Sequence, residues 1–344
     1  MHDSNLIGID LAKSVIQVCK INRDGELISN KAISPKKLRE LLAKSTPSIV
    51  AMEGCGGCHY WARLAESYGH EARIISPKKV KGYLQGQKTD ANDAIAIAVA
   101  AKQVGMRFSQ IKEEIQQSLQ TLDTSRRFLI RDLTALGNHI RAYLYEYGIT
   151  VNKGRKSLGE VIPIVLDDND TRLPQCLRST LSLLWERYII TESQLKVAEK
   201  SKAALVKQLE PCKRLLDLES VGNVCAAMLY ATLGDGSEFK NGRDASVYVG
   251  LTPKQHSSGG KTYMIGIDKR GGNKELRAAL YQGALSVISS LKTEPRTVKE
   301  AWLIELVKRV GVKRACIALA NKTVRTAWAL LATGKTYKPI LLSQ

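Results

Sequence analysis

The 344-residue sequence predicts a chain of mixed class, α/β in its first part and mainly α-helical after it. Three observations predict this. Short apolar runs alternate with helical patterns near the N-terminus, heptad repeats of apolar residues follow, and a glycine-rich segment then leads into further helical patterns. At roughly 100 to 200 residues per domain, this length allows about two domains. We divide the chain into three regions, residues 1–108, 109–210 and 211–344.

Five strands and three helices are expected in the first region. Runs rich in β-branched residues occupy positions 6–10, 15–21, 26–33, 49–53 and 72–75. Helical patterns cover residues 36–44 and 59–68, and a third helix begins near Asp90. The resulting order βββαβαβα, a meander followed by strands that alternate with helices, is typical of the ribonuclease-H-like fold, a mixed sheet with helices on its faces.

The middle region carries two coiled-coil patterns, separated by a break rich in Gly, Pro and Asp at residues 148–174. The first consists of apolar residues spaced alternately by four and three, with one arginine among them: Ile115, Leu119, Leu122, Arg126, Leu129, Leu133, Leu136, Ile140, Tyr143 and Tyr147. A weaker repeat runs from Leu181 to Leu209. Two such helices can pair antiparallel within the chain or between chains. Their length favours a role in dimerisation, and the sequence does not decide between the two pairings.

The third region begins compact and glycine-rich, and then predicts helices at residues 273–291 and 298–331, the second ending before Gly334. In Thr252-Pro-Lys-Gln-His-Ser-Ser-Gly-Gly-Lys261, two serines are expected in a flexible, exposed turn. Lys254, His256 and Lys261 surround them and could take a hydroxyl proton or stabilise developing negative charge. By spacing alone, an ordinary Ser/Gly loop is the better interpretation.

Positive charge indicates the class of partner. The chain contains 52 Lys and Arg against 33 Asp and Glu, a formal net charge of +19, and residues 251–344 alone hold 17 basic and 5 acidic residues. Neutralising phosphates releases counterions, so nucleic acid is the favoured partner, ahead of an anionic membrane surface. A merely solvated basic surface is the alternative.

The sequence also predicts a cytoplasmic protein. No run approaches the ~20 apolar residues that span a bilayer, and the first residues lack the pattern of a secretory signal. Seven cysteines, an odd number, suggest reduced thiols rather than disulfides. The run Cys55-Gly-Gly-Cys58-His59 matches a haem-attachment pattern and half of a zinc site. We reject both, because no export signal and no second Cys/His pair at usable spacing accompany it.

Four carboxylates are candidates for a metal site. Asp10 and Glu53 each close an apolar strand, and parallel pairing of these strands would set them side by side. Asp90 and Asp93 lie three residues apart at a helix start, on one face. Together these hard oxygen ligands favour Mg²⁺ (or Mn²⁺) and phosphoryl transfer on nucleic acid. Each acid taken singly is better explained as a strand-end or helix-capping residue. We call the four the acid tetrad.

These motifs resemble one family over nearly the whole chain. Glu53 with the following Cys-Gly-Gly and an aromatic-rich helix, Lys-Thr-Asp-Ala-Asn-Asp-Ala (residues 88–94), Gly-Leu-Thr-Pro-Lys-Gln-His-Ser-Ser-Gly-Gly-Lys (250–261) and Asp-Lys-Arg-Gly-Gly-Asn-Lys (268–274) are similar to the IS1111 subgroup of the IS110 DEDD transposases and recombinases, a family that includes Piv-type invertases. The sequence departs from the more widespread family pattern at two places. After Glu53 that pattern has Thr-Gly and an aromatic residue, whereas this sequence has Gly54-Cys55-Gly56-Gly57. The expected lysine context before the late glycines reads Ile267-Asp268-Lys269-Arg270.

The resemblance implies a mechanism. A RuvC-like N-terminal domain would supply the acid tetrad and a C-terminal transposase domain the nucleophile Ser258, with Ser257 beside it as the other possibility. Members bind divalent metal, cut and rejoin DNA through a serine-phosphate intermediate, and assemble as homodimers that pair into tetramers on donor and target DNA. An element-encoded noncoding RNA, called bridge or seeker RNA, selects the sites.

Three alternatives to this recombinase remain. A metal-dependent RuvC-like nuclease or junction resolvase would use the acid tetrad to activate water and would not need Ser258. An actin-like ATP-binding fold also opens with Gly-Ile-Asp, but it predicts a duplicated domain where this chain has heptads. A non-catalytic architectural protein would tolerate loss of all four acids. Our candidate nucleic-acid contacts are basic residues around Ser258 and the following helix: Lys254, Lys261, Lys269, Arg270, Lys274 and Arg277.

Overall fold

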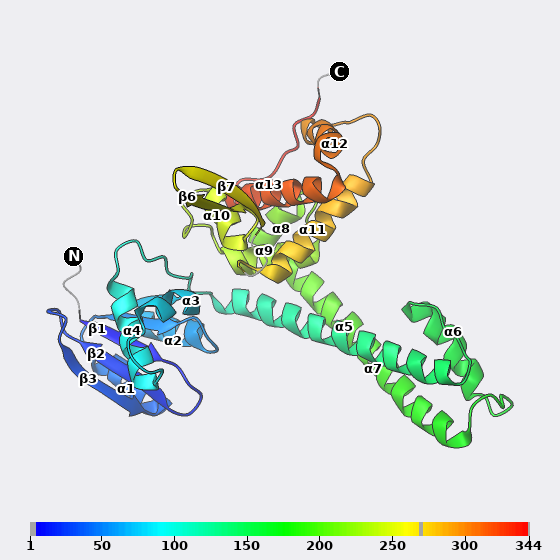
Figure 1. Cartoon of the computed structure of the whole chain (residues 1–344), viewed down its shortest axis with the longest axis horizontal. Helices are drawn as coiled ribbons and strands as arrows, with labels where there is room; N and C mark the ends of the chain where they lie inside the picture. The colour runs from blue at the N-terminus through cyan, green and yellow to red at the C-terminus, as the bar shows by residue number, and fades with distance from the viewer. Residues whose placement is uncertain (1–4, 268–270, 343–344) are drawn as a thin grey trace. The chain divides into compact units, whose positions relative to one another are not determined.

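The structure is a computed structural model that describes residues 5–267 and 271–342 (Figure 1). The chain divides into two compact units, Met1–Glu113 and Glu114–Gln344. The three-region division made from the sequence stays a prediction. Two of the predicted basic contacts, Lys269 and Arg270, lie outside the described residues.

A five-stranded mixed sheet forms the centre of the first unit. Its order is β3-β2-β1-β4-β5, with β1 (Leu6–Asp10) antiparallel to β2 (Ile16–Ile21) and parallel to β4 (Ile49–Glu53). The outer strands are β3 (Leu27–Ile33), antiparallel to β2, and β5 (Glu71–Ile75), parallel to β4. This arrangement confirms the predicted α/β fold class, and each strand begins within one residue of its predicted position.

Helices cover both faces of this sheet. On one face, α1 (Pro35–Lys44) and α2 (Cys58–Ser67) pack against alternate strand residues such as Ile7 and Ile9. On the other face, α4 (Asp90–Lys102) packs against Leu6, Ile49 and their neighbours. A short helix α3 (Pro77–Val80) and a 3₁₀ turn, residues Lys81–Tyr83, precede α4 and were not predicted. The central strands β1 and β4 are therefore buried on both faces, whereas Leu27 and Ile28 of the outer strand β3 are exposed.

Two long helices of the second unit pair within the chain. The helices α5 (Glu114–Glu146) and α7 (Gln175–Gln208) run antiparallel, as the ion pairs Arg126–Glu199 and Asp132–Arg187 show (Figure 1). Their contact surface uses residues of both predicted heptad patterns, including Leu133, Leu136, Ile140, Leu181, Tyr188 and Leu195, together with Leu144, which the predicted pattern did not include. The within-chain pairing left open by the sequence is thus the one observed, and dimerisation through these helices stays a prediction.

One expectation about the middle of the chain was wrong. Residues 148–174 were expected to be a break without helix, but Arg155–Leu166 form α6. Pro163 lies inside this helix, and three buried residues, Leu158, Ile162 and Val165, lie on the face that packs into the α5–α7 core. Burial of this apolar face outweighs the unfavourable proline.

In the described residues, six helices and one hairpin make up the rest of the second unit. The helices are α8 (Glu210–Leu216), α9 (Asn223–Leu233), α10 (Gly242–Val249), α11 (Lys274–Ser289), α12 (Val298–Val310) and α13 (Val312–Thr333). The single helix predicted over residues 298–331 is divided into α12 and α13, because Gly311 adopts a φ of 78°. No helix in the described part of the chain has the length and apolar character needed to cross a membrane.

Candidate active site

Asp10 and Glu53 lie side by side at one edge of the sheet. They end the parallel neighbours β1 and β4, whose last paired residues are Ile9 and Met52. Side chains alternate between faces along a strand, so Asp10 shares the face of Leu6 and Gly8, and Glu53 shares that of Ile49 and Ala51. Leu6, Ile49 and Ala51 pack against α4. Both carboxylates therefore lie on the sheet face that α4 covers.

Helix α4 brings the other two acids to this edge. Thr89 caps the helix, its Oγ1 accepting from the Asn92 backbone N–H at 3.3 Å, and Asp90 and Asp93 occupy the first turn. Gly8 permits the approach of the helix to β1. A Cβ on Gly8 would lie 2.7 Å from the Ala98 Cβ and closer still to the Ala94 carbonyl oxygen. No larger residue fits there without moving α4.

The four carboxylates interact electrostatically. Burial raises the pKa of Asp10 above its ordinary value of 3.8, and the charges of Asp93 and Asp90 raise it further. Burial also raises the pKa of Glu53, with added contributions from Asp10 and Asp93. Lys88 opposes both shifts. The charged forms of Asp10 and Glu53, which are disfavoured here, would gain stability from a cation.

The chemistry of the donors fits a divalent metal. Carboxylate oxygens are the ligands that Mg²⁺ and Mn²⁺ prefer. In the described ranges, no three His, Cys, Asp or Glu side chains are already gathered at one potential metal position. Three members of the acid tetrad would therefore have to move closer together to ligate one ion. Metal ligation by these four residues stays a prediction.

A chain of amide hydrogen bonds supports the start of α4. Gln17 on β2 lies opposite Asp10 and donates from Nε2 to Asn30 Oδ1 at 2.7 Å. Asn30 on β3 in turn donates from Nδ2 to the Ala91 carbonyl oxygen at 2.9 Å. This pair ties two strands to the turn that carries Asp90 and Asp93. Sequence reasoning missed it, and the only available signal was an asparagine, a residue disfavoured in strands, inside β3.

The residues of the rejected zinc or haem motif have a structural arrangement. Cys58 is the buried first residue of α2, while Cys55 is exposed. The His59 Nδ1 accepts from the Lys112 backbone N–H at 3.2 Å. Burial, with Lys112 and Arg63 nearby, lowers the pKa of His59 to about 4, so the ring is neutral at pH 7. His59 thereby fixes the chain segment that leaves the first unit.

Ser258 lies at the tip of an exposed β-hairpin in the second unit. The strands β6 (Pro253–Ser258) and β7 (Lys261–Ile267) are antiparallel, with Ser258 opposite Lys261. Gly259 and Gly260 connect them with φ of 56° and 75°, the two left-handed residues that a type I′ turn requires. The expectation of a flexible turn around both serines was wrong, because residues up to Ser258 belong to a strand.

One face of this hairpin gathers the groups expected around the serine. Lys254, His256 and Ser258 alternate with the other residues of β6 and so share a face, with Lys261 directly across from Ser258. Ser257 lies on the opposite face, where its Oγ is 3.3 Å from the Thr262 Oγ1. The two serines are therefore in different surroundings, and only Ser258 shares a face with Lys254, His256 and Lys261.

The remaining predicted contacts differ in their availability. Lys274 is exposed in the first turn of α11. Arg277 is half-buried and donates to the Val249 carbonyl oxygen at 3.2 Å and to the Gly271 carbonyl oxygen. These bonds hold the start of α11 against the end of α10. Phosphate contact by either residue stays a prediction. The acid tetrad belongs to the first unit, and Ser258 to the second.

Comparisons with known proteins match both units. A model of IS110-type DEDD transposases matches residues 7–149, and a model of the IS116/IS110/IS902 transposase family matches residues 212–299. The transposase for insertion sequence element IS1111A of Coxiella burnetii is 37% identical over 98% of this chain and 92% of its own length. A probable family 20 transposase of Pseudomonas aeruginosa is 35% identical over 97% and 98%, respectively. The pilin gene-inverting protein of Moraxella lacunata is 24% identical over 96% of this chain and 97% of its own.

Proposed function

The chain belongs to the IS110 family of insertion-sequence transposases and is a DNA transposase, and we propose that it cuts and rejoins DNA with a metal-bound acid tetrad and Ser258 as nucleophile. The observation that supports this most is the convergence of carboxylates on the α4 face of the sheet. There, burial and mutual repulsion raise the pKa values of Asp10 and Glu53.

The chemistry conserves the energy of the phosphodiester. A divalent cation, when bound, supplies positive charge that polarises the phosphate. The Ser258 Oγ forms a bond to phosphorus and loses its proton to a base, for which His256 on the same face is suited. The bond from phosphorus to one sugar oxygen breaks, and that oxygen takes up a proton. A new DNA hydroxyl then displaces Ser258 by the reverse steps, so that strands are rejoined without an external energy source.

Three variants test this proposal. Asp10→Asn should abolish metal-dependent cleavage, and Ser258→Ala should abolish covalent protein–DNA adducts detected on denaturing gels. Ser257→Ala is the matched control and should retain both, because its hydroxyl lies on the other hairpin face. A Ser258→Ala protein that still recombines DNA would refute the serine assignment. One that cuts without rejoining would instead identify a metal-dependent nuclease that uses water.

We also propose that a guide RNA encoded by the element selects the donor and target DNA. The excess of 17 basic over 5 acidic residues in positions 251–344 supports a polyanionic partner. The test is to purify the protein, sequence the RNA that accompanies it, and assay recombination on DNA matched to that RNA. Equal recombination of matched and scrambled DNA would exclude guidance.

Self-association into dimers and then tetramers is supported by the outer surface of α7. Leu183, Ile190 and Val197, exposed by 68%, 49% and 62%, recur every seven residues away from the contact with α5. A second copy of the chain would bury this heptad stripe. Changing all three to Gln should lower the mass measured by light scattering. The matched control replaces Leu181, which faces α5, and should instead lower the melting temperature.

The cytoplasm is the compartment in which we expect the protein to act. All seven cysteines are free, and burial raises the pKa of each of the five buried ones, to about 11 for Cys19 and Cys225 and to about 12 for Cys212. Such thiols are neutral and unreactive at pH 7. This usage suits a reducing compartment.

A further inference from the structure

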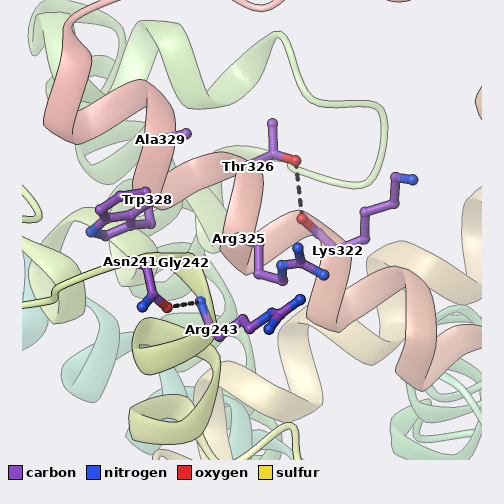
Figure 2. A pocket seen from close by; sticks show the side chains of 8 residues that line it. All are labelled: Asn241, Gly242, Arg243, Lys322, Arg325, Thr326, Trp328 and Ala329. Carbon is purple, nitrogen blue, oxygen red and sulfur yellow. Dashed lines mark hydrogen bonds between the residues drawn. The ribbon is translucent and has the colours of Figure 1, made fainter.

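A basic pocket lies between the start of α10 and the middle of α13, on elements other than the strands of the Ser258 hairpin (Figure 2). Its volume is about 560 Å³. Arg243 contributes from α10, and Lys322 and Arg325 from α13, with Asn241, Thr326 and Trp328 also lining the pocket. Sequence reasoning did not select these residues. Among the residues that the structure describes, no carboxylate lines the pocket.

The walls of the pocket are held in place. Gly242 lets α10 approach α13, since a Cβ there would lie 3.0 Å from the Arg325 Cα and carbonyl oxygen. Ser246 Oγ donates to the Asn321 carbonyl oxygen at 3.3 Å, and Trp328 Nε1 donates to the Gly236 carbonyl oxygen at 3.0 Å. The cationic side chains therefore extend from two helices whose relative position is fixed.

The three cationic side chains are exposed and lack acidic partners. None of them forms an ion pair with a carboxylate of the described residues. In Figure 2 the side chains of Arg243 and Arg325 converge from the two helices, while Lys322 extends away from them. The Lys322 Nζ lies over the Trp302 ring, 4.7 Å from its centre. Two guanidinium groups that face one solvent-filled space repel each other unless an anion lies between them.

The composition of α13 extends this positive surface. Its 22 residues contain four Lys or Arg and no Asp or Glu. At 100° per residue, Arg314, Lys322 and Arg325 fall on one side of the helix, and the first and last are about 16 Å apart along its axis. A ligand that follows this side must carry negative charges repeated along its length.

We propose that this pocket binds the phosphodiester backbone of a nucleic acid, with Arg243 and Arg325 on one phosphate and Lys322 on a neighbouring one. The planar guanidinium fork matches phosphate oxygens, and a chain of phosphates supplies the repeated charge that a single small anion lacks. The choice of nucleic acid as the ligand rests on the proposed function as a DNA transposase. The pocket would bind the substrate or the guide through residues other than the proposed nucleophile and the acid tetrad.

The test compares two double variants that remove the same charge. Arg243→Gln with Arg325→Gln empties the pocket of its converging guanidinium groups. Lys207→Gln with Arg309→Gln is the control, because both residues are exposed on other helices, α7 and α12. Both double variants are made in the full chain carrying Ser258→Ala. Binding is then measured in metal-free buffer, which prevents metal-dependent cleavage even if Ser258 is not the nucleophile.

Binding is measured by fluorescence anisotropy with single-stranded DNA, duplex DNA and single-stranded RNA at several salt concentrations. The pocket variant should lose about tenfold in affinity for at least one probe, with the salt slope reduced by about 1 to 2, while the control changes by less than about twofold. The probe whose affinity falls identifies the kind of nucleic acid that the pocket binds. Equal affinity and slope for the two double variants on all three probes would overturn the proposal.

Discussion

Lys202 on α7 and Asp123 on α5 form an ion pair inside the helix pair, with 2% and 3% of their surfaces exposed. Asp123 also accepts a hydrogen bond from Arg127 Nε at 3.0 Å. The Nη1 of Arg127 in turn forms an ion pair with Glu275 Oε1 on α11 at 3.2 Å. Burial lowers the pKa of Lys202, and the Asp123 carboxylate opposes that shift. A charged group this deep is tolerated only because its partner is present, so the pair fixes how α5 and α7 align.

Removing one member of this pair should be strongly destabilising. Asp123→Leu leaves the Lys202 ammonium buried without its partner, and we expect a loss of about 3 to 5 kcal/mol in the free energy of unfolding. The double variant with Lys202→Met should recover most of it. Urea unfolding of the four proteins in this cycle gives the coupling. Additive effects of the two substitutions would contradict the interpretation.

Gly8 should tolerate no side chain. Gly8→Ala places a methyl group against Ala94 and Ala98 of α4, and we expect a loss of about 1 to 3 kcal/mol in the free energy of unfolding together with reduced cleavage. Gly82→Ala is the control, since nothing lies within 4 Å of a Cβ at that position. Unfolding by urea and cleavage rates measure the two effects. A Gly8→Ala protein as stable and active as Gly82→Ala would show that α4 can move.

The acid tetrad should lower the stability of the metal-free protein at neutral pH. The pKa of Asp10 is higher in the folded state than in the unfolded state, so the folded state binds this proton more tightly. The free energy of unfolding therefore falls as the pH rises from 3.8 through the raised pKa. Asp10→Asn should therefore raise the metal-free melting temperature at pH 7 by about 1 to 4 °C. It should also reduce the further rise that Mg²⁺ or Mn²⁺ gives to the wild-type protein.

Glu186→Gln is the control for this experiment, because it removes the same charge from an exposed position on α7. Its melting temperature should match the wild type with and without metal. If Asp10→Asn melts below the wild type in metal-free buffer at pH 7, the carboxylates do not repel each other as argued.

Asn30 should act as a positioning residue for the acid tetrad. Asn30→Leu removes the bond to the Ala91 carbonyl oxygen, and we expect the metal concentration for half-maximal cleavage to rise several-fold, with a stability loss of about 1 kcal/mol. Ser29→Ala, on the same strand, is the control. Metal titrations of cleavage separate positioning from structural loss, because a purely structural defect would lower the maximal rate and leave the metal requirement unchanged.

The sequence predicted the first unit well because its signals are local. Strands buried on both faces appear as apolar runs, and turns between them carry Gly, Asn and Asp, so the positions of Asp10 and Glu53 followed from the pattern. The contribution of Gly8 was not predictable in this way. Its small size matters only because α4, more than eighty residues later, packs on it.

Other features depend on contacts that the sequence pattern does not contain. The hairpin that carries Ser258 exposes both faces, so no apolar alternation marked it as two strands. Apart from Gly311 itself, nothing in the sequence indicated that the helix predicted over residues 298–331 is divided there. Arg277 was predicted to contact phosphate, and no pattern in the sequence showed that it donates to the Val249 carbonyl oxygen. The basic pocket combines residues about eighty positions apart, which only the packing of α10 on α13 brings together.

Because α5 and α7 run antiparallel along each other, their shared length sets the distance between the α6 end of the pair and its other end. Each heptad adds about 10 Å to both helices at once. Deleting one heptad from each helix would preserve the alternation of apolar layers while moving the α6 end inward by that step. Family members could thus set different distances between the same two ends by gaining or losing matched blocks of seven residues, without altering any residue that performs chemistry.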